Sequence, residues 1–306
     1  MIPTFRRILC AACVLAILGS AVAQTNAPFT RTEDVIYGRK FGTALTLDVF
    51  QPAKPNGYGV VFMVSGGWFS AHEAINPGLL RPFLDRGYAV FAVVHGSQPK
   101  FNITEIVPDI HRAIRFIRHN AAKYGVNPAK LGIAGASAGG HLALTMAVKG
   151  TPGKADAPDP VDRESSEIAG VACFFPPTDF LNYGQPGDDA VGVGTLKAFK
   201  AAFGPRSDTP EERQKLGREI SPIYFVTSNT PPILIMHGDA DKLVPIYQAE
   251  QFIKRCQELG GEAKLVVRPG KEHGWGWPEI IKDEEVFADW FDLHLRGVKA
   301  APAKAP

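Results

Sequence analysis

The sequence predicts an α/β fold, in which helices cover both faces of a mostly parallel, doubly wound sheet of about eight strands. Short, continuous apolar runs recur along the chain, as expected for strands that are covered on both faces. Amphipathic helical patterns separate these runs, and such alternation is typical of parallel strands joined by right-handed crossovers. Hydrophobic residues make up 45% of the 306 residues and charged residues 21%, which is the balance of a globular chain.

Seven segments have the pattern of a strand. The first, 45–50, alternates apolar and polar residues, as a half-buried strand does. The other six are continuous apolar runs at 59–64, 88–94, 131–134, 168–174, 233–236 and 263–267. Runs of this kind suit the interior of a parallel sheet.

Four longer segments have the pattern of a helix: 108–124, 140–148, 245–259 and 283–295. In the first of them, one stripe is apolar and consists of Ile110, Ala113, Ile114, Ile117 and Ala121. The third opens with Pro245 and stops at Gly260, and these residue types are favoured at the two ends of a helix.

Two stretches interrupt the alternation. The segment 150–167 is polar and rich in proline, which predicts a surface loop. The segment 176–230 is longer and carries aromatic residues such as Phe180, and short helices are predicted at 195–203 and 209–218. We interpret it as a lid-like insertion or a substrate wall. The alternative is a packed excursion on the surface.

The two ends of the chain have their own composition. Residues 1–23 have the pattern of a signal peptide: Arg6 and Arg7, an apolar run at 8–18, and small residues at 21–23. The run is too short to span a bilayer as a permanent helix, so we expect cleavage, no stable membrane anchor and a secreted or periplasmic protein. An uncleaved anchor is the alternative. The remainder is predicted as one domain at 24–297 and a disordered tail at 298–306.

Charge and cysteine content limit the possible partners. Without Arg6 and Arg7, the 33 basic residues become 31, which equals the number of acidic residues. A neutral domain argues against a nucleic-acid partner. Cleavage would leave Cys173 and Cys256, which could form one disulfide or remain two buried thiols.

The clearest catalytic motif is Gly135-Ala136-Ser137-Ala138-Gly139, between a predicted strand and a predicted helix. G-x-S-x-G in this context forms a sharp turn that presents the serine hydroxyl at the carboxyl edge of the sheet. The glycines avoid collisions with the neighbouring strand and helix. The start of the next helix directs backbone N–H groups towards developing negative charge. We therefore predict Ser137 as a nucleophile.

An acid and a base follow the nucleophile in the chain order that this motif requires. Asp239 and Asp241 both follow the predicted strand 233–236, and we favour Asp241 because it lies nearer the helix that opens at Pro245. His273 lies in a glycine-flanked loop after the last predicted strand. Its imidazole can accept and return a proton near neutral pH, while the carboxylate holds the tautomer.

The loop after the strand 59–64 contains Gly66 and Gly67, then Trp68 and Phe69. Glycines let the backbone approach a substrate oxygen closely. We predict an oxyanion hole made by the N–H groups of Gly67, Trp68 and Ala138. An ordinary turn is the alternative.

Four aromatic side chains are predicted to bind substrate: Trp68, Phe69, Phe180 and Trp275. No pair of histidines has the H-E-x-x-H spacing or another tight spacing of metal ligands. We therefore predict no catalytic metal.

These motifs resemble those of the α/β-hydrolase superfamily, and within it the family of bifunctional feruloyl and acetyl xylan esterase-like (esterase/lipase) proteins. The resemblance covers about residues 35–295, and the matching pieces are 65–69, 135–142, 159–179, 237–245 and 273–274. It implies a cofactor-free serine hydrolase with Ser137, Asp241 and His273 as its triad. The usual motif has histidine before the glycines of the oxyanion loop, whereas this chain has Ser65.

We expect an exported serine carboxylesterase that acts on short-chain or plant-polysaccharide-linked acetyl or feruloyl esters. An arylformamidase and a serine peptidase of the prolyl oligopeptidase type are alternatives within the same chemistry. A catalytically silent binding module on the same fold is the alternative outside enzymes. The complete set of serine, aspartate and histidine argues against that module.

Overall fold

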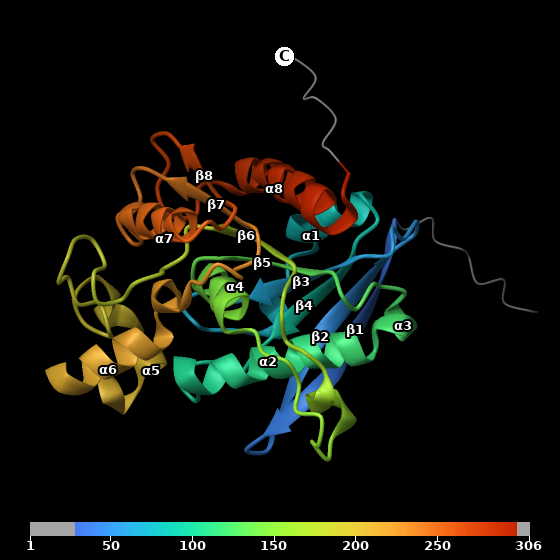
Figure 1. Cartoon of the computed structure of the whole chain (residues 1–306), viewed down its shortest axis with the longest axis horizontal. Helices are drawn as coiled ribbons and strands as arrows, with labels where there is room; N and C mark the ends of the chain where they lie inside the picture. Colours follow the sequence, from blue (N-terminus) through green and yellow to red (C-terminus); the bar gives the residue numbers. More distant parts are fainter. Residues whose placement is uncertain (1–27, 299–306) are drawn as a thin grey trace, which may run out of the picture.

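The structure, a computed structural model, describes residues 28–298. The predicted signal peptide 1–23 and residues 299–306 of the predicted tail lie outside the described residues. Within residues 28–298, eight strands form one sheet in the order β1-β2-β4-β3-β5-β6-β7-β8 (Figure 1). The strands are β1 Phe29–Lys40, β2 Thr43–Pro52, β3 Gly59–Val64, β4 Ala89–Val94, β5 Leu131–Ala136, β6 Gly170–Phe174, β7 Ile233–Gly238 and β8 Ala263–Arg268.

The pairing of the strands confirms the predicted fold class. β2 pairs antiparallel with β1 and with β4, and every pair from β4 to β8 along the sheet is parallel. All seven predicted strands are present. The eighth, β1, was not predicted because it lies at the edge of the sheet, where Tyr37 is its one buried residue and no apolar run marks it.

Helices cover both faces of the sheet (Figure 1). α1 and α8 pack on one face, and α2, α4 and α7 pack on the other. Their bounds are α1 Pro77–Asp85, α2 Ile103–His119, α3 Ala121–Tyr124, α4 Ala138–Lys149, α5 Lys200–Phe203, α6 Pro210–Ile220, α7 Tyr247–Glu258 and α8 Trp277–Phe291, and a π-helical turn follows at Asp292–Arg296. Short 3-10 segments lie at His72–Ala74, Pro160–Arg163, Gly194–Phe199, Pro205–Ser207 and Pro222–Phe225.

Two helices, α2 and α8, begin five and six residues earlier than predicted, at 103 instead of 108 and at 277 instead of 283. α2 begins at Ile103 because Asn102 and Glu105 form a reciprocal capping box, with Glu105 N–H donating to Asn102 Oδ1 at 3.2 Å and Asn102 N–H donating to Glu105 Oε2 at 2.9 Å. Pro108 therefore lies inside the helix and does not open it. α8 begins at Trp277, with a proline in its first turn.

The insertion at 176–230 is packed against the body of the protein. It contains α5, α6 and three of the 3-10 segments, and Tyr183 and Phe203 within it are buried. Gln248 of α7 fastens its start: Gln248 Oε1 accepts from the Asp179 N–H at 2.7 Å, and Gln248 Nε2 donates to the Tyr183 carbonyl at 2.7 Å. Phe180, Tyr183 and Phe203 thus belong to the core on the α4 side of the sheet, whereas Tyr224 is exposed.

The two cysteines within the domain are separate buried thiols. Cys173 lies on β6 and Cys256 on α7. Burial raises the pKa of Cys256 to about 12 and also raises that of Cys173. Of the two predicted possibilities, the structure has the pair of thiols.

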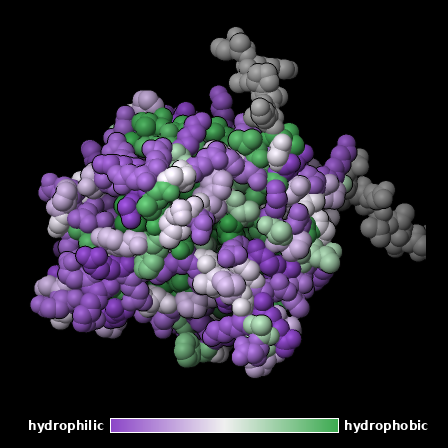
Figure 2. All heavy atoms as spheres, viewed as in Figure 1, coloured by the Kyte–Doolittle hydropathy of each residue, from purple (hydrophilic) through white to green (hydrophobic). Residues whose placement is uncertain are grey.

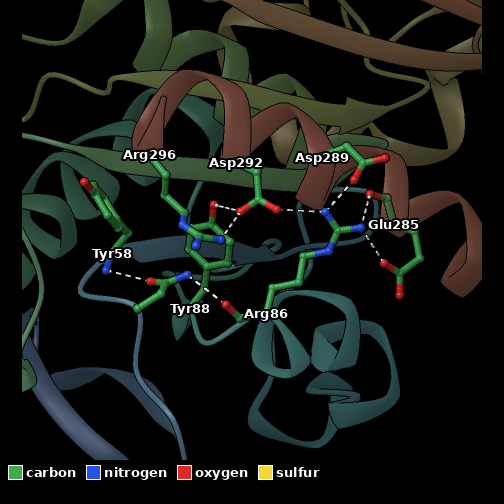
Figure 3. A network of polar contacts seen from close by, with 8 residues as sticks. Tyr58, Arg86, Tyr88, Glu285, Asp289, Asp292 and Arg296 are labelled. Atoms are coloured by element: carbon green, nitrogen blue, oxygen red, sulfur yellow. Dashed lines mark hydrogen bonds and ion pairs between the residues drawn. The ribbon is translucent and has the colours of Figure 1, made fainter. Parts of the chain in front are cut away.

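A polar network joins the C-terminal helix to the turn between α1 and β4 (Figure 3). Arg86 contacts Glu285 at 2.8 Å and Asp292 at 2.9 Å, and it also donates to Asp289. Tyr88 donates to the other oxygen of Asp292 at 2.8 Å. The network holds α8 against α1 and hence against the sheet.

The face of the molecule drawn in Figure 2 is mostly polar. Hydrophilic residues predominate on it, and hydrophobic residues form small, separate groups. Between residues 28 and 298, none of the helices combines the length and the apolar character that a membrane span requires.

Candidate active site

Three neighbouring regions of the sheet edge supply the predicted catalytic side chains. Ser137 follows β5, Asp241 follows β7 and His273 follows β8. These strands are parallel, so their carboxyl ends meet at one edge. The fold therefore brings together residues that are far apart in the sequence.

Ser137 has a backbone conformation that residues other than glycine rarely adopt. Its φ is 53° and its ψ is −119°. A Cβ atom at Gly135 would lie 2.6 Å from the Gly139 carbonyl oxygen, and a Cβ at Gly139 would lie 2.8 Å from that of Met63. Both glycines are thus required by close backbone contacts. The Ser137 N–H donates to the Phe174 carbonyl at 3.0 Å and fixes the turn to β6.

A chain of hydrogen bonds joins the three side chains. His273 Nδ1 lies 2.7 Å from Asp241 Oδ2, and His273 Nε2 lies 3.0 Å from Ser137 Oγ. Because an ionised carboxylate can only accept, Nδ1 carries the proton and Nε2 is left to accept from the serine hydroxyl. This is the orientation in which an imidazole can act as a base towards Ser137.

The side chain of Asp241 is fully buried but well supplied with donors. Its Oδ1 accepts from the N–H groups of Leu243 and Val244, each at 2.9 Å. Burial raises the pKa of Asp241, yet the hydrogen bonds from His237, His273 and the Val244 N–H outweigh burial and hold that pKa below its ordinary value. Asp241 is therefore ionised at neutral pH.

Asp239 has a different role from Asp241. Its Oδ1 accepts from the Gly270 N–H at 2.6 Å, which ties the loop after β7 to the loop after β8. The structure thus pairs His273 with Asp241, as predicted, and places Asp239 in a turn contact.

The predicted oxyanion loop is a tight β-turn from Gly66 to Phe69. Phe69 N–H donates to the Gly66 carbonyl at 2.9 Å, and the two central residues, Gly67 and Trp68, have φ of 55° and 61°. Both central carbonyls are held by Gln98, at 3.3 Å through its side chain and at 3.2 Å through its backbone. Among residues 28–298, the N–H groups of Gly67 and Trp68 have no hydrogen-bond acceptor.

Ala138 supplies a third donor of the same kind. It is the first residue of α4, so its N–H has no acceptor within the helix. The positive end of the α4 dipole lies at the same point. Ala138 follows Ser137 in the chain, and Gly67 and Trp68 follow β3, the strand that pairs with β5. An oxyanion hole made by these three N–H groups stays a prediction.

Ser65, which replaces the usual histidine, is held by a histidine from the next strand. His95 Nδ1 donates to the Gly96 carbonyl at 2.7 Å, so its Nε2 accepts from the Ser65 hydroxyl at 2.9 Å. Burial lowers the pKa of His95 to about 4, and the ring is therefore neutral. This contact was not predicted, because it joins the ends of β3 and β4, whose pairing is a property of the folded sheet.

Three of the four residues predicted to bind substrate, Trp68, Phe180 and Trp275, are buried in the structure. Phe180 is 0% exposed and the Trp68 side chain belongs to a residue only 2% exposed, so their rings support the site from within the core. Trp68 Nε1 donates to His141 Nδ1 at 3.1 Å, and His141 Nε2 donates to the Ile220 carbonyl at 2.7 Å. The burial of these two rings was not predicted, because it depends on how the insertion 176–230 packs in the fold.

The other two predicted residues differ from each other. Trp275 is buried, and its Nε1 donates to Asp283 at 2.9 Å. Phe69 is exposed and is free to contact a ligand. Phe175, which was not predicted, has its ring centroid 4.4 Å from that of His273.

One group of side chains within residues 28–298 has the donors and spacing for a metal ion, namely Glu33, Asp48 and His72. The guanidinium of Arg31 already donates to Asp48 at 2.7 Å. The group lies on β1, β2 and the 3-10 segment His72–Ala74, apart from the strands that carry the candidate triad.

Several curated proteins that are similar to this chain in sequence are esterases. Esterase LipC of Mycobacterium tuberculosis is 27% identical over 249 residues, a match that covers 79% of this chain and 59% of LipC. The chain spans about half to seven-tenths of the length of the first curated relatives that it matches.

Solved structures agree with this finding. A truncated carbohydrate esterase from gut microbiota superimposes with a TM-score of 0.73 at 25% identity, covering 87% of this chain and 98% of that one. A thermophilic esterase from Thermogutta terrifontis gives a TM-score of 0.68 at 25% identity, covering 89% and 95%.

The family model described as BD-FAE matches residues 47–256, a range that contains Ser137 and Asp241. This match spans more than half of the chain, and the sheet is that of the α/β-hydrolase esterases. The chain belongs to the BD-FAE family.

Proposed function

We propose that the protein is a serine carboxylesterase. The observation that carries the proposal is the unbroken chain of hydrogen bonds from Ser137 Oγ through His273 to Asp241, at 3.0 and 2.7 Å. An imidazole between the serine hydroxyl and an ionised, buried carboxylate, with the serine on a strained turn, forms the arrangement that activates a hydroxyl for acyl transfer.

In the proposed reaction, His273 accepts the Ser137 proton as the hydroxyl attacks the ester carbonyl. The N–H groups of Gly67, Trp68 and Ala138 stabilise the resulting oxyanion, and each such donor typically contributes roughly 3–4 kcal/mol to lowering the barrier. His273 then protonates the departing alcohol. A water molecule, activated by the same imidazole, releases the acid and restores the serine.

We infer that the substrates are short-chain esters or acetyl and feruloyl esters linked to polysaccharides. The similarity to a carbohydrate esterase supports this substrate class. Export through the signal-peptide pattern at 1–23 would bring the enzyme to such substrates. Mass spectrometry of the protein from the producing cells tests export, since cleavage after Ala23 gives a mature chain that begins at Gln24.

The decisive test replaces the nucleophile. Ser137→Ala should reduce turnover of p-nitrophenyl acetate by at least about 10⁴-fold, because the covalent route is lost. Ser228→Ala, at an exposed serine, is the matched control and should retain full turnover. Retained turnover in Ser137→Ala would refute the proposal.

Covalent labelling distinguishes an esterase from a silent binding module. The Thermogutta terrifontis esterase is known in a form phosphonylated by sarin. A fluorophosphonate probe should likewise label this protein at Ser137, and the label should be absent in Ser137→Ala. Formylkynurenine and a proline-containing peptide substrate, assayed beside the esters, test the arylformamidase and peptidase alternatives.

A further inference from the structure

A small cavity lies beside Ser137, on the α8 side of the sheet. Its volume is about 190 Å³. Its lining includes Ala136, which precedes Ser137, and Gly274, which follows His273. Aromatic side chains from β3, β6 and α8 make most of the remaining wall apolar. The wall of the cavity thus includes residues adjacent in the chain to both Ser137 and His273.

One carboxyl group interrupts the apolar wall. Glu284 of α8 lines the cavity and is only 1% exposed. Its Oε2 has no hydrogen-bond partner among residues 28–298. Burial raises the pKa of Glu284 well above its ordinary value, and neighbouring Glu285 adds to the rise. Burial thus favours the neutral form of this carboxyl group, and a neutral carboxyl group can both donate and accept a hydrogen bond.

The other acidic residues of α8 have partners. Glu285 and Asp289 pair with Arg86, Glu279 pairs with Lys271, and Asp283 accepts from Trp275. Glu284 is left out of these contacts. A buried carboxyl group without a partner costs free energy, so its position calls for an occupant that satisfies it.

The size and lining of the cavity define that occupant. An apolar cavity of about 150 Å³ can bind benzene, so 190 Å³ accommodates a ring with a small substituent. The substituent must form a hydrogen bond with a carboxyl group in apolar surroundings. A hydroxyl does so without charge, whereas an ammonium group would require a buried ion pair at a high cost of desolvation.

We propose that this cavity is a subsite for a ring-sized apolar part of the ester that ends in a hydroxyl group, and that Glu284 recognises the hydroxyl. The inference rests on the proposed esterase function and names the residue that sets its specificity. The ring can belong to the acid or to the alcohol of the ester, since both are attached at Ser137 during the reaction.

Two pairs of substrates test the subsite and identify the part of the ester that occupies it. The first pair is the methyl esters of para-hydroxyphenylpropanoic acid and of phenylpropanoic acid. The second is the acetates of para-hydroxyphenylethanol and of phenylethanol. The ratio of kcat/KM within a pair cancels any general change in activity. The proteins are the wild type, Glu284→Leu, and the control Glu285→Gln, whose residue faces Arg86 instead of the cavity.

We expect the wild type to prefer the hydroxylated member of one pair by roughly tenfold, which corresponds to one hydrogen bond in a buried site. Glu284→Leu should abolish or reverse this preference, and Glu285→Gln should keep it. Equal rates within both pairs, or a preference that survives in Glu284→Leu, would overturn the subsite.

Hydrolysis of p-nitrophenyl acetate by the wild type separates this inference from the proposed function. If the wild type cleaves that ester but has no preference for the hydroxyl, the subsite alone is refuted. A chain that cleaves none of these esters refutes the esterase function and the subsite with it.

Discussion

At the scale of single residues, His141 is a buried histidine that links Trp68 to α6 by two hydrogen bonds. The Trp68 ring nitrogen can only donate, so His141 must accept at Nδ1 and donate to the Ile220 carbonyl from Nε2. Both bonds require the neutral ring. Burial lowers the pKa of His141 to about 4, and Lys149 adds to the lowering although the bond to Ile220 opposes it.

This arrangement predicts a loss of stability in acid. Between pH 6.5 and about 4, the unfolded chain binds a proton at His141 that the folded chain excludes, so the free energy of unfolding falls as the pH falls. The contribution of this residue is roughly 3 kcal/mol over the window, at about 1.4 kcal/mol per pH unit. His141→Gln can keep both hydrogen bonds without titrating, and it should lose less stability between pH 7 and 4.5 in urea unfolding experiments.

The control for this prediction is His119→Gln, at an exposed position near the end of α2. It should keep the pH dependence of the wild type. An equal loss of stability in wild type and His141→Gln would contradict the assignment. The wild-type chain has two further residues of the same kind, since burial also lowers the pKa of His95 and of His111 to about 4.

The residues of the candidate triad could be predicted, whereas the aromatic residues around it could not. The spacing of Gly135, Ser137 and Gly139 reports a local backbone constraint, so the sequence contains it directly. Burial of Phe180 depends on how a distant insertion packs, and no local pattern reports that. The contact of Ser65 with His95 depends on the order of strands in the sheet.

At the scale of elements, the junction of β5 and α4 is held by close backbone contacts. Gly135→Ala places a methyl group within 2.6 Å of the Gly139 carbonyl oxygen, which cannot move without shifting the turn. We expect a loss of roughly 1–3 kcal/mol in the free energy of unfolding, as for other overpacked sites, together with a large fall in kcat.

Gly170→Ala is the matched control, since it adds the same methyl group to the neighbouring strand β6. There the nearest atoms would be 3.9 Å away, which is ordinary contact. Its unfolding midpoint should lie close to that of the wild type. If both variants were equally stable, the steric account of the turn would be wrong.

The elements themselves were predictable where burial was high. The six interior strands carry apolar or alternating patterns, and the edge strand β8 was predicted from its apolar run although none of its residues is fully buried. α7 follows from the residue types at its two ends. β1 has no such run because the edge of the sheet leaves most of its residues accessible. The start of α2 was missed because a capping box outweighs the usual meaning of a proline.

At the scale of the whole molecule, the contacts of Arg86 join the C-terminal helix to the rest of the domain (Figure 3). Its side chain is 25% exposed, so these charges are only partly screened by solvent. Arg86→Gln leaves three carboxylates close together without their shared cation. We expect a loss of roughly 1–3 kcal/mol in the free energy of unfolding, less than for a fully buried pair.

Arg81→Gln is the control, because Arg81 forms a solvent-exposed pair with Asp85 one helical turn away. Its loss should be below about 1 kcal/mol. Thermal unfolding of both variants checks the prediction, and a larger effect at Arg81 would contradict it. Added salt should reduce the difference between Arg86→Gln and the wild type.

The insertion packs closely against the turn 66–69, and this contact has a consequence for engineering. A Cβ at Gly67 would lie 2.4 Å from the Phe199 ring, and the Ile220 carbonyl at the end of α6 anchors His141 beneath Trp68. If the insertion 176–230 is replaced by that of another family member, the new segment must therefore place a ring that fits against Gly67 and a carbonyl that accepts from His141. Substitutions at the exposed residue Phe69 avoid this constraint, so they are a simpler way to change selectivity than replacing the insertion.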